Sequence, residues 1–264
     1  SDSPVDSFFE SKFIKTKLPN YEKRQTQIKY AREVVKTLNN SQHNYVEAPT
    51  GIGKSLGYTV PAAVFLEKNL SQKIIIATAT KNLQSQIIDK DWPLISERFP
   101  DLKIATLKGK SNYLCISALA RQFSHYFGHD SNTDEKAAWI IMALFLYNMD
   151  GDIEKISRQL IGWMSPLKDL ILDIRADLHC TRGQCNTSGC IYGMHLLSAK
   201  DAHIIVTNHF KLVMMDDEIL ELTKAVIIDE AERFGDNIRH ALSTQINSWE
   251  INSLFYRLMG NNNR

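Results

Sequence analysis

Apolar positions near the start of the chain follow first a helical and then a strand-like spacing. Between residues 22 and 39, apolar side chains recur at intervals of three and four, which predicts an amphipathic helix. The positions are Ile28, Ala31, Val34, Val35 and Leu38. The short run NYVEA at 44–48 comes next and predicts a buried strand. A helix that leads into a strand begins an alternating pattern.

The alternation continues through two separate parts of the chain. The expected elements are a helix over 53–66, a strand over 73–80, a helix over 81–99, and strands over 101–107, 202–208 and 224–232. Strands that alternate with helices favour a mostly parallel sheet covered by helices. We therefore expect an α/β fold with a mostly parallel sheet and flanking helices.

The alternation stops after Cys115. Residues 135–178 carry helical patterns and no convincing strand, which predicts a helical domain inserted into the α/β domain. The three patterns lie at 135–148, 153–164 and 166–178. We place the insertion at 111–199, between the two parts of the α/β domain at 1–110 and 200–240.

Composition narrows the class of protein without deciding its function. With 264 residues, 44% of them hydrophobic and 23% charged, the chain is typical of a globular protein with one or two domains. The net charge of +1 means that any nucleic-acid surface must be a local patch. No run approaches the roughly 18 apolar residues of a membrane helix, and the first residues lack a secretory pattern. We expect a cytoplasmic protein that does not bind membranes.

The strongest chemical signal is APTGIGKS at residues 48–55, between an expected strand and an expected helix. In a phosphate-binding loop of this kind, glycines let backbone N–H groups converge on the phosphates. Lys54 would reach the β- and γ-phosphates, and the Ser55 hydroxyl would bind Mg²⁺. The usual pattern begins with glycine, and Ala48 stands there in this chain. The alternative is an ordinary glycine-containing turn with a solvated lysine. The expected ATP contacts from this stretch are Ala48, Pro49, Thr50, Gly51, Ile52, Gly53, Lys54 and Ser55.

The second signal is an acidic pair, Asp229 and Glu230, at the end of an expected strand. Nucleotide sites of open α/β sheets lie at the carboxyl ends of the strands. We expect Asp229 to hold Mg²⁺ and Glu230 to orient and deprotonate the attacking water, with Lys54 as the third catalytic residue. The alternative is an acidic first turn attracted by a helix dipole. Together, the loop and the acidic pair predict nucleotide hydrolysis.

Six stretches occur in the order found in one family. They are YEKRQTQ (21–27), APTGIGKS (48–55), ATATKNLQSQI (77–87), LKGKSNYLC (107–115), VTNH (206–209) and IIDEAE (227–232). Together they resemble the superfamily 2 iron–sulfur DNA helicases of the XPD and DinG type. The resemblance implies a RecA-like P-loop helicase lobe with an inserted helical iron–sulfur domain. It also implies ATP-driven movement from 5′ to 3′ on single-stranded DNA and action on forked or R-loop DNA in repair or replication conflicts. We expect such a protein to act as a monomer.

The resemblance also suggests which residues recognise adenine and DNA. It places Arg24 and Gln27 at the adenine, and a glutamine amide matches the N6 and N7 positions of adenine, which favours ATP over GTP. Hydroxyl and amide groups at a strand end suit contacts with the DNA backbone, and lysines beside an aromatic ring suit a single-strand path. Thr80 can equally serve as a helix cap. The expected DNA contacts are Thr78, Thr80, Gln84, Lys108, Lys110 and Tyr113.

The four cysteines flank the predicted insertion. They are Cys115, Cys180, Cys185 and Cys190, and the last three lie within the polar stretch CTRGQCNTSGC. Four soft thiolates suit either tetrahedral zinc or a 4Fe–4S cluster, and the spacing of the cysteines does not decide between the two. A third alternative is that the four thiols are unrelated to one another. The resemblance implies the 4Fe–4S cluster, in a structural role that joins the two ends of the insertion.

Two features depart from the family pattern. Glu232 stands where the acidic motif often has histidine, which puts the coupling between hydrolysis and DNA movement in question. Only 32 residues follow Glu232, too few for a second motor lobe. We therefore expect the first lobe and cluster domain only, with 241–264 at the start of an arch domain, and with weak nucleotide binding and slow hydrolysis. The alternatives are an ATP- and DNA-binding assembly module without unwinding and a zinc-stapled, nucleic-acid-dependent ATPase.

Overall fold

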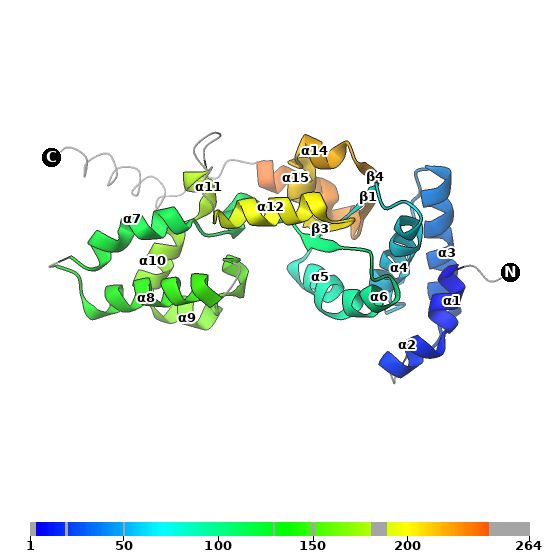
Figure 1. Cartoon of the computed structure of the whole chain (residues 1–264), viewed down its shortest axis with the longest axis horizontal. Coiled ribbons are helices and arrows are strands. Elements are labelled where there is room, and N and C mark those ends of the chain that lie inside the picture. The colour runs from blue at the N-terminus through cyan, green and yellow to red at the C-terminus, as the bar shows by residue number, and fades with distance from the viewer. Residues whose placement is uncertain are drawn as a thin grey trace.

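The structure, a computed structural model, describes six stretches of the chain: residues 4–18, 21–49, 51–128, 130–148, 151–180 and 189–242. Its centre is a four-stranded sheet in the order β2-β3-β1-β4 (Figure 1). The strands are β1 (Lys73–Thr78), β2 (Ile104–Thr106), β3 (Ile204–Asn208) and β4 (Thr223–Ile228). All three pairings are parallel, which confirms the expected α/β class.

The burial of each strand follows its place in the sheet. Strand β1 pairs on both sides, and Ile75 lies opposite Ile205 of β3 and Val226 of β4. All of its residues are buried, as in strands covered by helices on both faces. Strand β4 lies at the edge, where Val226 is 42% exposed. Parallel pairing brings the carboxyl ends of β1, β3 and β4 to one edge of the sheet.

Helices of the α/β part flank the sheet. They are α1 (Pro4–Glu10), α2 (Lys12–Lys17), α3 (Gln25–Asn40), α4 (Lys54–Glu67), α5 (Lys81–Gln86), α6 (Trp92–Arg98), α12 (Ile191–Asp201), α13 (His209–Val213), α14 (Asp217–Leu220) and α15 (Phe234–Leu242). The expected helix over 81–99 is a chain of three elements, because a π-helical segment, η1 (Ile87–Asp91), joins α5 to α6. Two short 3-10 segments are η2 (Lys110–Asn112) and η4 (Ala231–Arg233). Helices α3 and α4 pack together and share an apolar core with the sheet.

One expected strand is absent. Residues 44–48 pair with no strand within the described part of the chain, and Tyr45 is 94% exposed. Helix α3 ends at Asn40, and its C-cap residue, Ser41, has a left-handed backbone conformation. The Asn44 side-chain amide donates a hydrogen bond back to the Thr37 hydroxyl. The strand prediction for NYVEA is therefore wrong in this structure. The run has only three apolar residues among polar ones, too few to require burial.

The stretch between β2 and β3 is mainly helical, as expected. Its first helices are α7 (Ile116–Tyr126), α8 (Thr133–Asn148), η3 (Ile153–Lys155), α9 (Arg158–Trp163), α10 (Ser165–Asp173) and α11 (Ala176–His179). Figure 1 shows α7, α8, α9 and α10 together at one end of the molecule, with α1, α2 and α3 at the other. These helices have an apolar core of their own, which includes Leu119, Met142, Leu167 and Leu170. The expected boundaries, 111–199, stay a prediction.

Two of the expected helices in this stretch are broken, and two helices, α7 and α12, were missed. The pattern over 153–164 divides because the Ser157 hydroxyl accepts a hydrogen bond from the Leu160 N–H and caps a new helix, α9. The pattern over 166–178 breaks at Arg175, whose extended backbone lets Leu114 and Arg175 form an isolated antiparallel bridge. Sequence periodicity did not anticipate α7. None of the helices in the described ranges is long and apolar enough to cross a membrane.

Candidate nucleotide site

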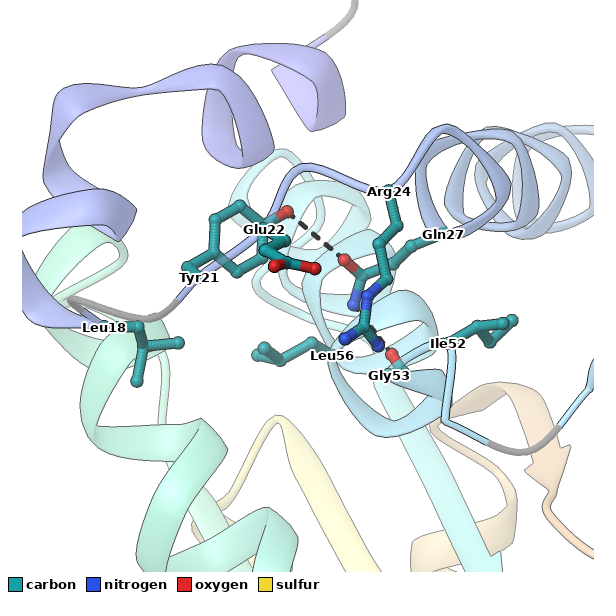
Figure 2. Close-up of a pocket in the computed structure, with 8 residues that line it drawn as sticks. All are labelled: Leu18, Tyr21, Glu22, Arg24, Gln27, Ile52, Gly53 and Leu56. Atoms are coloured by element: carbon teal, nitrogen blue, oxygen red, sulfur yellow. Dashed lines mark hydrogen bonds between the residues drawn. The ribbon is translucent and has the colours of Figure 1, made fainter.

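A cavity of about 340 Å³ lies where the segment before α3 meets the turn that opens α4. Figure 2 shows the side chains that line it. They are Leu18, Tyr21, Glu22, Arg24, Gln27, Ile52, Gly53 and Leu56. The cavity therefore brings together two groups that the sequence placed apart, the pair expected to recognise adenine and the expected phosphate-binding loop.

Two glycines shape the loop in front of α4. Gly51 and Gly53 both have φ of 82°, a left-handed conformation that glycine adopts without strain. Gly53 is the N-cap of α4, so Lys54 is the first residue of the helix and Ser55, which is buried, is the second. The free N–H groups at this helix start form an anion-binding end of the helix dipole. Ala48 and Pro49 precede the turn, and Thr50 lies outside the described residues.

Gln27 and Arg24 hold this loop from the side of α3. The Gln27 amide nitrogen donates to the Gly53 carbonyl at 2.9 Å, and the Tyr21 hydroxyl donates to Gln27 Oε1 at 3.2 Å, as Figure 2 shows. Arg24 donates to the Gly51 carbonyl. Both ends of the Gln27 amide are thus engaged within the protein. Adenine recognition by Gln27 stays a prediction, and it requires these two bonds to be exchanged for bonds to the base.

The end of β4 carries the acidic pair. The Asp229 N–H donates to the Ala77 carbonyl of β1 at 2.9 Å, which fixes the backbone at the sheet edge. Asp229 Oδ1 accepts from the Glu230 N–H at 2.9 Å, and Oδ2 accepts from the Tyr58 hydroxyl at 3.0 Å. Burial, together with the nearby Asp229 charge, raises the pKa of Tyr58 well above its ordinary value. The carboxylate is therefore held by a donor from α4, the helix that the phosphate-binding loop opens.

Glu230 has an unfavourable backbone conformation. Its φ is 53°, in the left-handed region, which costs a residue other than glycine roughly 1–3 kcal/mol. Its Oε2 is buried and accepts no hydrogen bond within the described part of the chain, and Arg233 lies at 3.9 Å as a long ion pair. Strain and an unsatisfied buried oxygen in one residue are typical of functional sites.

Tyr58 and His209 are site residues to which sequence reasoning assigned no role. His209 Nε2 lies 2.9 Å from the Asp229 carbonyl, and Nδ1 lies 3.0 Å from the Asn237 amide nitrogen. Because a carbonyl only accepts, Nε2 carries the proton and Nδ1 accepts from Asn237. His209 thereby fixes the turn after β4. The VTNH stretch pointed to this position, and Tyr58 could have been found as a residue three positions after Ser55 on the same helix face.

The expected DNA contacts divide into buried and accessible groups. The ring of Tyr113 is 1% exposed, packs near Tyr192 and His195, and its hydroxyl accepts from the Lys108 N–H at 3.1 Å. Its expected stacking on a base is therefore wrong for this conformation, because the core encloses the ring. Thr78 and Gln84 are buried too. Of the remaining expected contacts, Thr80 caps α5 by accepting a hydrogen bond from the Leu83 N–H at 3.4 Å. This is the helix-cap role that the sequence offered as the alternative for Thr80.

The two lysines of this group differ in their partners. Lys108 donates to Asp152 and to Glu154, the latter at 2.6 Å, and Glu154 also pairs with Lys81 at 2.6 Å. These ion pairs join the α/β part to the η3 turn of the helical part. Lys110 lies over the Tyr192 ring at 5.5 Å and is half-buried.

Three of the four cysteines lie in the described stretches, each at the end of a helix. Cys115 precedes α7, Cys180 follows α11 and Cys190 precedes α12. Each is half-buried and outside any disulfide, and Cys185 lies outside the described residues. The described ranges hold no group of three or more side chains arranged to bind a metal.

Backbone hydrogen bonds fix the positions of the first two of these cysteines. The Cys115 N–H donates to the Ile174 carbonyl at 2.7 Å, and the Cys180 N–H donates to the Ala176 carbonyl at 2.7 Å. The Gly193 N–H donates to Cys190 Sγ at 3.4 Å, the kind of contact that stabilises a thiolate. The described cysteines thus fit a thiolate site in their chemistry.

Comparison with known proteins shows what parts of the chain are similar to. Residues 28–127 match the model of the DEAD/DEAH box helicases. Over 100 residues the chain is 45% identical to the 3′-5′ exonuclease DinG of Bacillus subtilis, a match that covers 38% of this chain and 11% of that protein. It is 26% identical over 269 residues to the ATP-dependent DNA helicase DinG of Escherichia coli K12, covering 94% of this chain and 36% of that protein. The chain is thus similar to proteins named DinG. Its four-stranded parallel sheet with flanking helices is a RecA-like lobe, as the sequence resemblance implied.

The DinG-like match has a limited extent. The chain spans about a third of the length of the Escherichia coli relative, and the Bacillus subtilis match covers a smaller share. The family model ends at 127, so it covers the phosphate-binding loop and the first part of the helical stretch. The longer match to the Escherichia coli relative covers 94% of the chain, well beyond the region of the family model.

Proposed function

We propose that this DinG-like chain forms the nucleotide-binding motor lobe of an ATP-dependent DNA helicase. The observation that carries the proposal is the hydrogen bond from Tyr58 to Asp229. It ties the acidic end of β4 to the helix whose first residue is Lys54, as a shared Mg²⁺–nucleotide site requires.

The proposed roles follow from the positions of the side chains. The loop at 48–55 and Lys54 bind the phosphates, and Arg24 and Gln27 border the cavity that would take the nucleoside. Ser55 and Asp229 hold Mg²⁺, which neutralises charge on the phosphates. Glu230 orients the attacking water and accepts its proton, and its unsatisfied Oε2 leaves it an acceptor for that purpose.

DNA would be the track of this motor. The Escherichia coli relative is named an ATP-dependent DNA helicase, and this supports single-stranded DNA as the partner. We further propose 5′ to 3′ movement, action on forked or R-loop DNA, a role in repair or replication conflicts, and function as a monomer. Thr80 and Lys110 are the candidate DNA contacts that remain accessible or half-buried. Location in the cytoplasm stays a prediction.

The cysteines are proposed to hold a 4Fe–4S cluster that joins the two ends of the helical domain at 111–199. The Cys115 backbone pairs with the segment that leads to Cys180, and the Gly193 N–H donates to Cys190, which supports thiolate ligation by these residues. Anaerobic purification followed by metal analysis tests this. Iron with acid-labile sulfide is expected, and one zinc per chain would show a zinc staple instead.

Nucleotide binding is the first test of the motor proposal. Binding of a fluorescent ATP analogue in the presence of Mg²⁺ is expected for the chain and is expected to be lost in Lys54→Ala. Binding unaffected by Lys54→Ala would overturn the assignment of the loop.

A second candidate function is an ATP- and DNA-binding assembly module that does not unwind DNA. The observation that favours it is Glu232, which is exposed in η4 at the position where the acidic motif often has histidine. Strand displacement by the full-length protein separates the two, with 5′-tailed and 3′-tailed duplexes to give the direction. ATP-dependent displacement of the 5′-tailed duplex supports the motor, and binding without displacement supports the module.

A further inference from the structure

Helix α5 (Lys81–Gln86) is held at both of its ends by side chains from other parts of the chain. At its last residue, the Gln86 amide nitrogen donates a 2.7 Å hydrogen bond to Ser55 Oγ, 31 positions away in the sequence. At its first residue, Lys81 Nζ forms a 2.6 Å ion pair with Glu154 of η3. The first contact reaches the loop of the proposed nucleotide site, and the second reaches the helical part of the molecule.

The contact with Gln86 leaves Ser55 able to bind a further ligand. A hydroxyl oxygen has two lone pairs and one proton. The Gln86 N–H occupies one lone pair, so the other lone pair and the proton remain for other partners. Ser55 is buried and is the second residue of α4, directly after the loop. A neutral donor at this place restrains the rotation of the hydroxyl and adds no charge that would compete with a metal ion.

The chain around Gln86 supports a role beyond packing. Gln86 is the last residue before the π-helical segment η1, which packs against α4. Single π-helical turns inside α-helices occur frequently at functional sites. Gln86 is only half-buried, so its amide could bond to water if Ser55 were absent. Burial of Gln86 therefore does not by itself require the contact with Ser55.

The ion pair at the start of α5 belongs to a larger group of charges. Glu154 also pairs with Lys108 at 2.6 Å, and Lys108 pairs in turn with Asp152. The side chains of these three residues are 18%, 12% and 8% exposed in that order, whereas the Lys81 side chain is 61% exposed. Largely buried partners thus fix Glu154. It is a fixed point of the helical part to which the start of α5 is attached.

We propose that Gln86 is a positioning residue of the nucleotide site and that the helical part sets its position through the Lys81–Glu154 ion pair. This inference rests on the proposed function, in which Ser55 holds Mg²⁺ at the phosphates. Gln86 acts through Ser55, whose hydroxyl it orients. Because coupling between two sites is reciprocal, the attachment of α5 to the helical part and the binding of Mg²⁺–nucleotide favour each other.

The first test compares ATP-analogue affinity in Mg²⁺ with affinity in EDTA. Gln86→Met removes the donor at similar length. We expect it to reduce the Mg²⁺-dependent gain in affinity about 10-fold, the lower end of the usual effect of losing a residue that orients a metal ligand. Affinity in EDTA should change little. Asn82→Met, at an exposed position of the same helix, is the matched control and should leave both affinities unchanged.

A mutant cycle shows whether Gln86 acts through Ser55. In a Ser55→Ala background, Gln86→Met should cause no further loss of the Mg²⁺-dependent gain, because the positioned hydroxyl is already absent. If Gln86→Met fails to fold, the smaller Gln86→Ala carries the same expectation. Additive losses in the cycle, or equal losses in Mg²⁺ and in EDTA, would overturn the positioning role.

The contribution of the helical part is tested from the other end of α5. Lys81→Met removes the ion pair without changing the loop, and we expect it to reduce the Mg²⁺-dependent gain about 2- to 5-fold, because a partly exposed ion pair is weak. Combined with Gln86→Met, it should cause no further loss. Lys103→Met is the control, because it breaks an exposed 2.8 Å pair with Asp201 away from α5. A Lys81→Met variant with the full gain would overturn the role of the helical part.

The failure of this inference is distinguishable from that of the proposed function. If wild-type protein shows Mg²⁺-dependent binding that Lys54→Ala abolishes, while Gln86→Met leaves the gain intact, only the positioning role is overturned. If wild-type protein shows no Mg²⁺-dependent nucleotide binding at all, the proposed function fails, and the inference fails with it.

Discussion

The hydroxyl of Tyr58 donates a 3.0 Å hydrogen bond to Oδ2 of Asp229, although the two residues lie 171 positions apart in the chain. Tyr58 is 1% exposed and Asp229 is half-buried, so the bond is partly buried. It connects the helix that begins at the phosphate-binding loop with the acidic end of an edge strand. A change at either residue is therefore expected to affect the other.

Tyr58→Phe removes this bond and leaves the ring in place. We expect the free energy of unfolding to fall by about 1 kcal/mol, the usual net value of a hydrogen bond, or somewhat more because the acceptor is charged. Mg²⁺-dependent nucleotide binding should weaken as well, since Asp229 loses a restraint. Urea unfolding and nucleotide titration measure the two effects.

Tyr30→Phe is the matched control for that change. Tyr30 lies on α3 near Asp229, whose charge adds to burial in raising the pKa of Tyr30 to about 12, and its hydroxyl has no hydrogen bond recorded within the described stretches. We expect its loss to change stability by less than about 0.5 kcal/mol. Equal effects of the two substitutions on the free energy of unfolding and on nucleotide binding would show that the Tyr58–Asp229 hydrogen bond contributes to neither.

Gly53→Ala should disrupt the loop through two separate causes. A Cβ at this position would lie 2.3 Å from Gln27 Nε2, and the φ of 82° is unfavourable for alanine by about 1–2 kcal/mol. We expect loss of the Gln27 contact and a large fall in nucleotide affinity. Gly162→Ala on α9 is the control, because a Cβ there meets nothing within 4 Å. It should be neutral or stabilising by up to about 1 kcal/mol, as thermal unfolding would show.

Lys108→Met should separate the helical part from the α/β part. Lys108 pairs with Asp152 and Glu154, and all three side chains are largely buried. Removal of one partner from a buried ion pair costs roughly 3–5 kcal/mol, because the remaining charges are left poorly compensated.

Lys103→Met is the surface control for Lys108→Met. Lys103 pairs with Asp201 at 2.8 Å, but both side chains are exposed, so the expected change is below about 1 kcal/mol. Denaturant unfolding of both variants gives the comparison. Similar small effects would show that the Lys108 ion pairs are as weak as surface pairs.

Asp91 should make stability depend on pH. Burial raises its pKa from 3.8 to about 6, so the folded chain holds this proton more tightly than the unfolded chain. The contribution of Asp91 is then most favourable below pH 3.8 and is lost as the pH rises through 6. At 1.36 kcal/mol for each pH unit between these two values, the penalty at neutral pH is about 3 kcal/mol.

The pH dependence predicts an unusual effect of Asp91→Asn. The variant should be more stable than the wild-type protein at pH 7.5, and the difference should shrink as the pH falls below 5. Thermal unfolding across this range measures it. A variant that is less stable at pH 7.5 would show that the carboxylate is well compensated in the folded protein.

The local elements could be predicted from the sequence because their signals are local. Apolar runs correctly predicted strands β1, β2, β3 and β4, and helical periodicity correctly predicted helices α3, α4 and α8. The turn before α4 was predictable for the same reason, since Gly51 and Gly53 mark a backbone that only glycine adopts readily, and phosphate binding there stays a prediction. Periodicity failed where a single residue began a new helix, as Ser157 does at the N-cap of α9.

Tertiary structure decided which of these elements reach one another. Tyr58 and His209 are ordinary residues within their own segments, and each gains its place at the site from a hydrogen bond to Asp229, which is remote in sequence. Burial likewise depends on packing, which left Tyr45 in solvent and enclosed the Tyr113 ring. By itself the sequence determined the periodic elements, the phosphate-binding turn and the order of the motifs, because these follow from neighbouring residues. Only the folded chain decided which side chains hold Asp229 and Ser55, because hydrogen bonds between distant segments form only after the sheet and helices have packed.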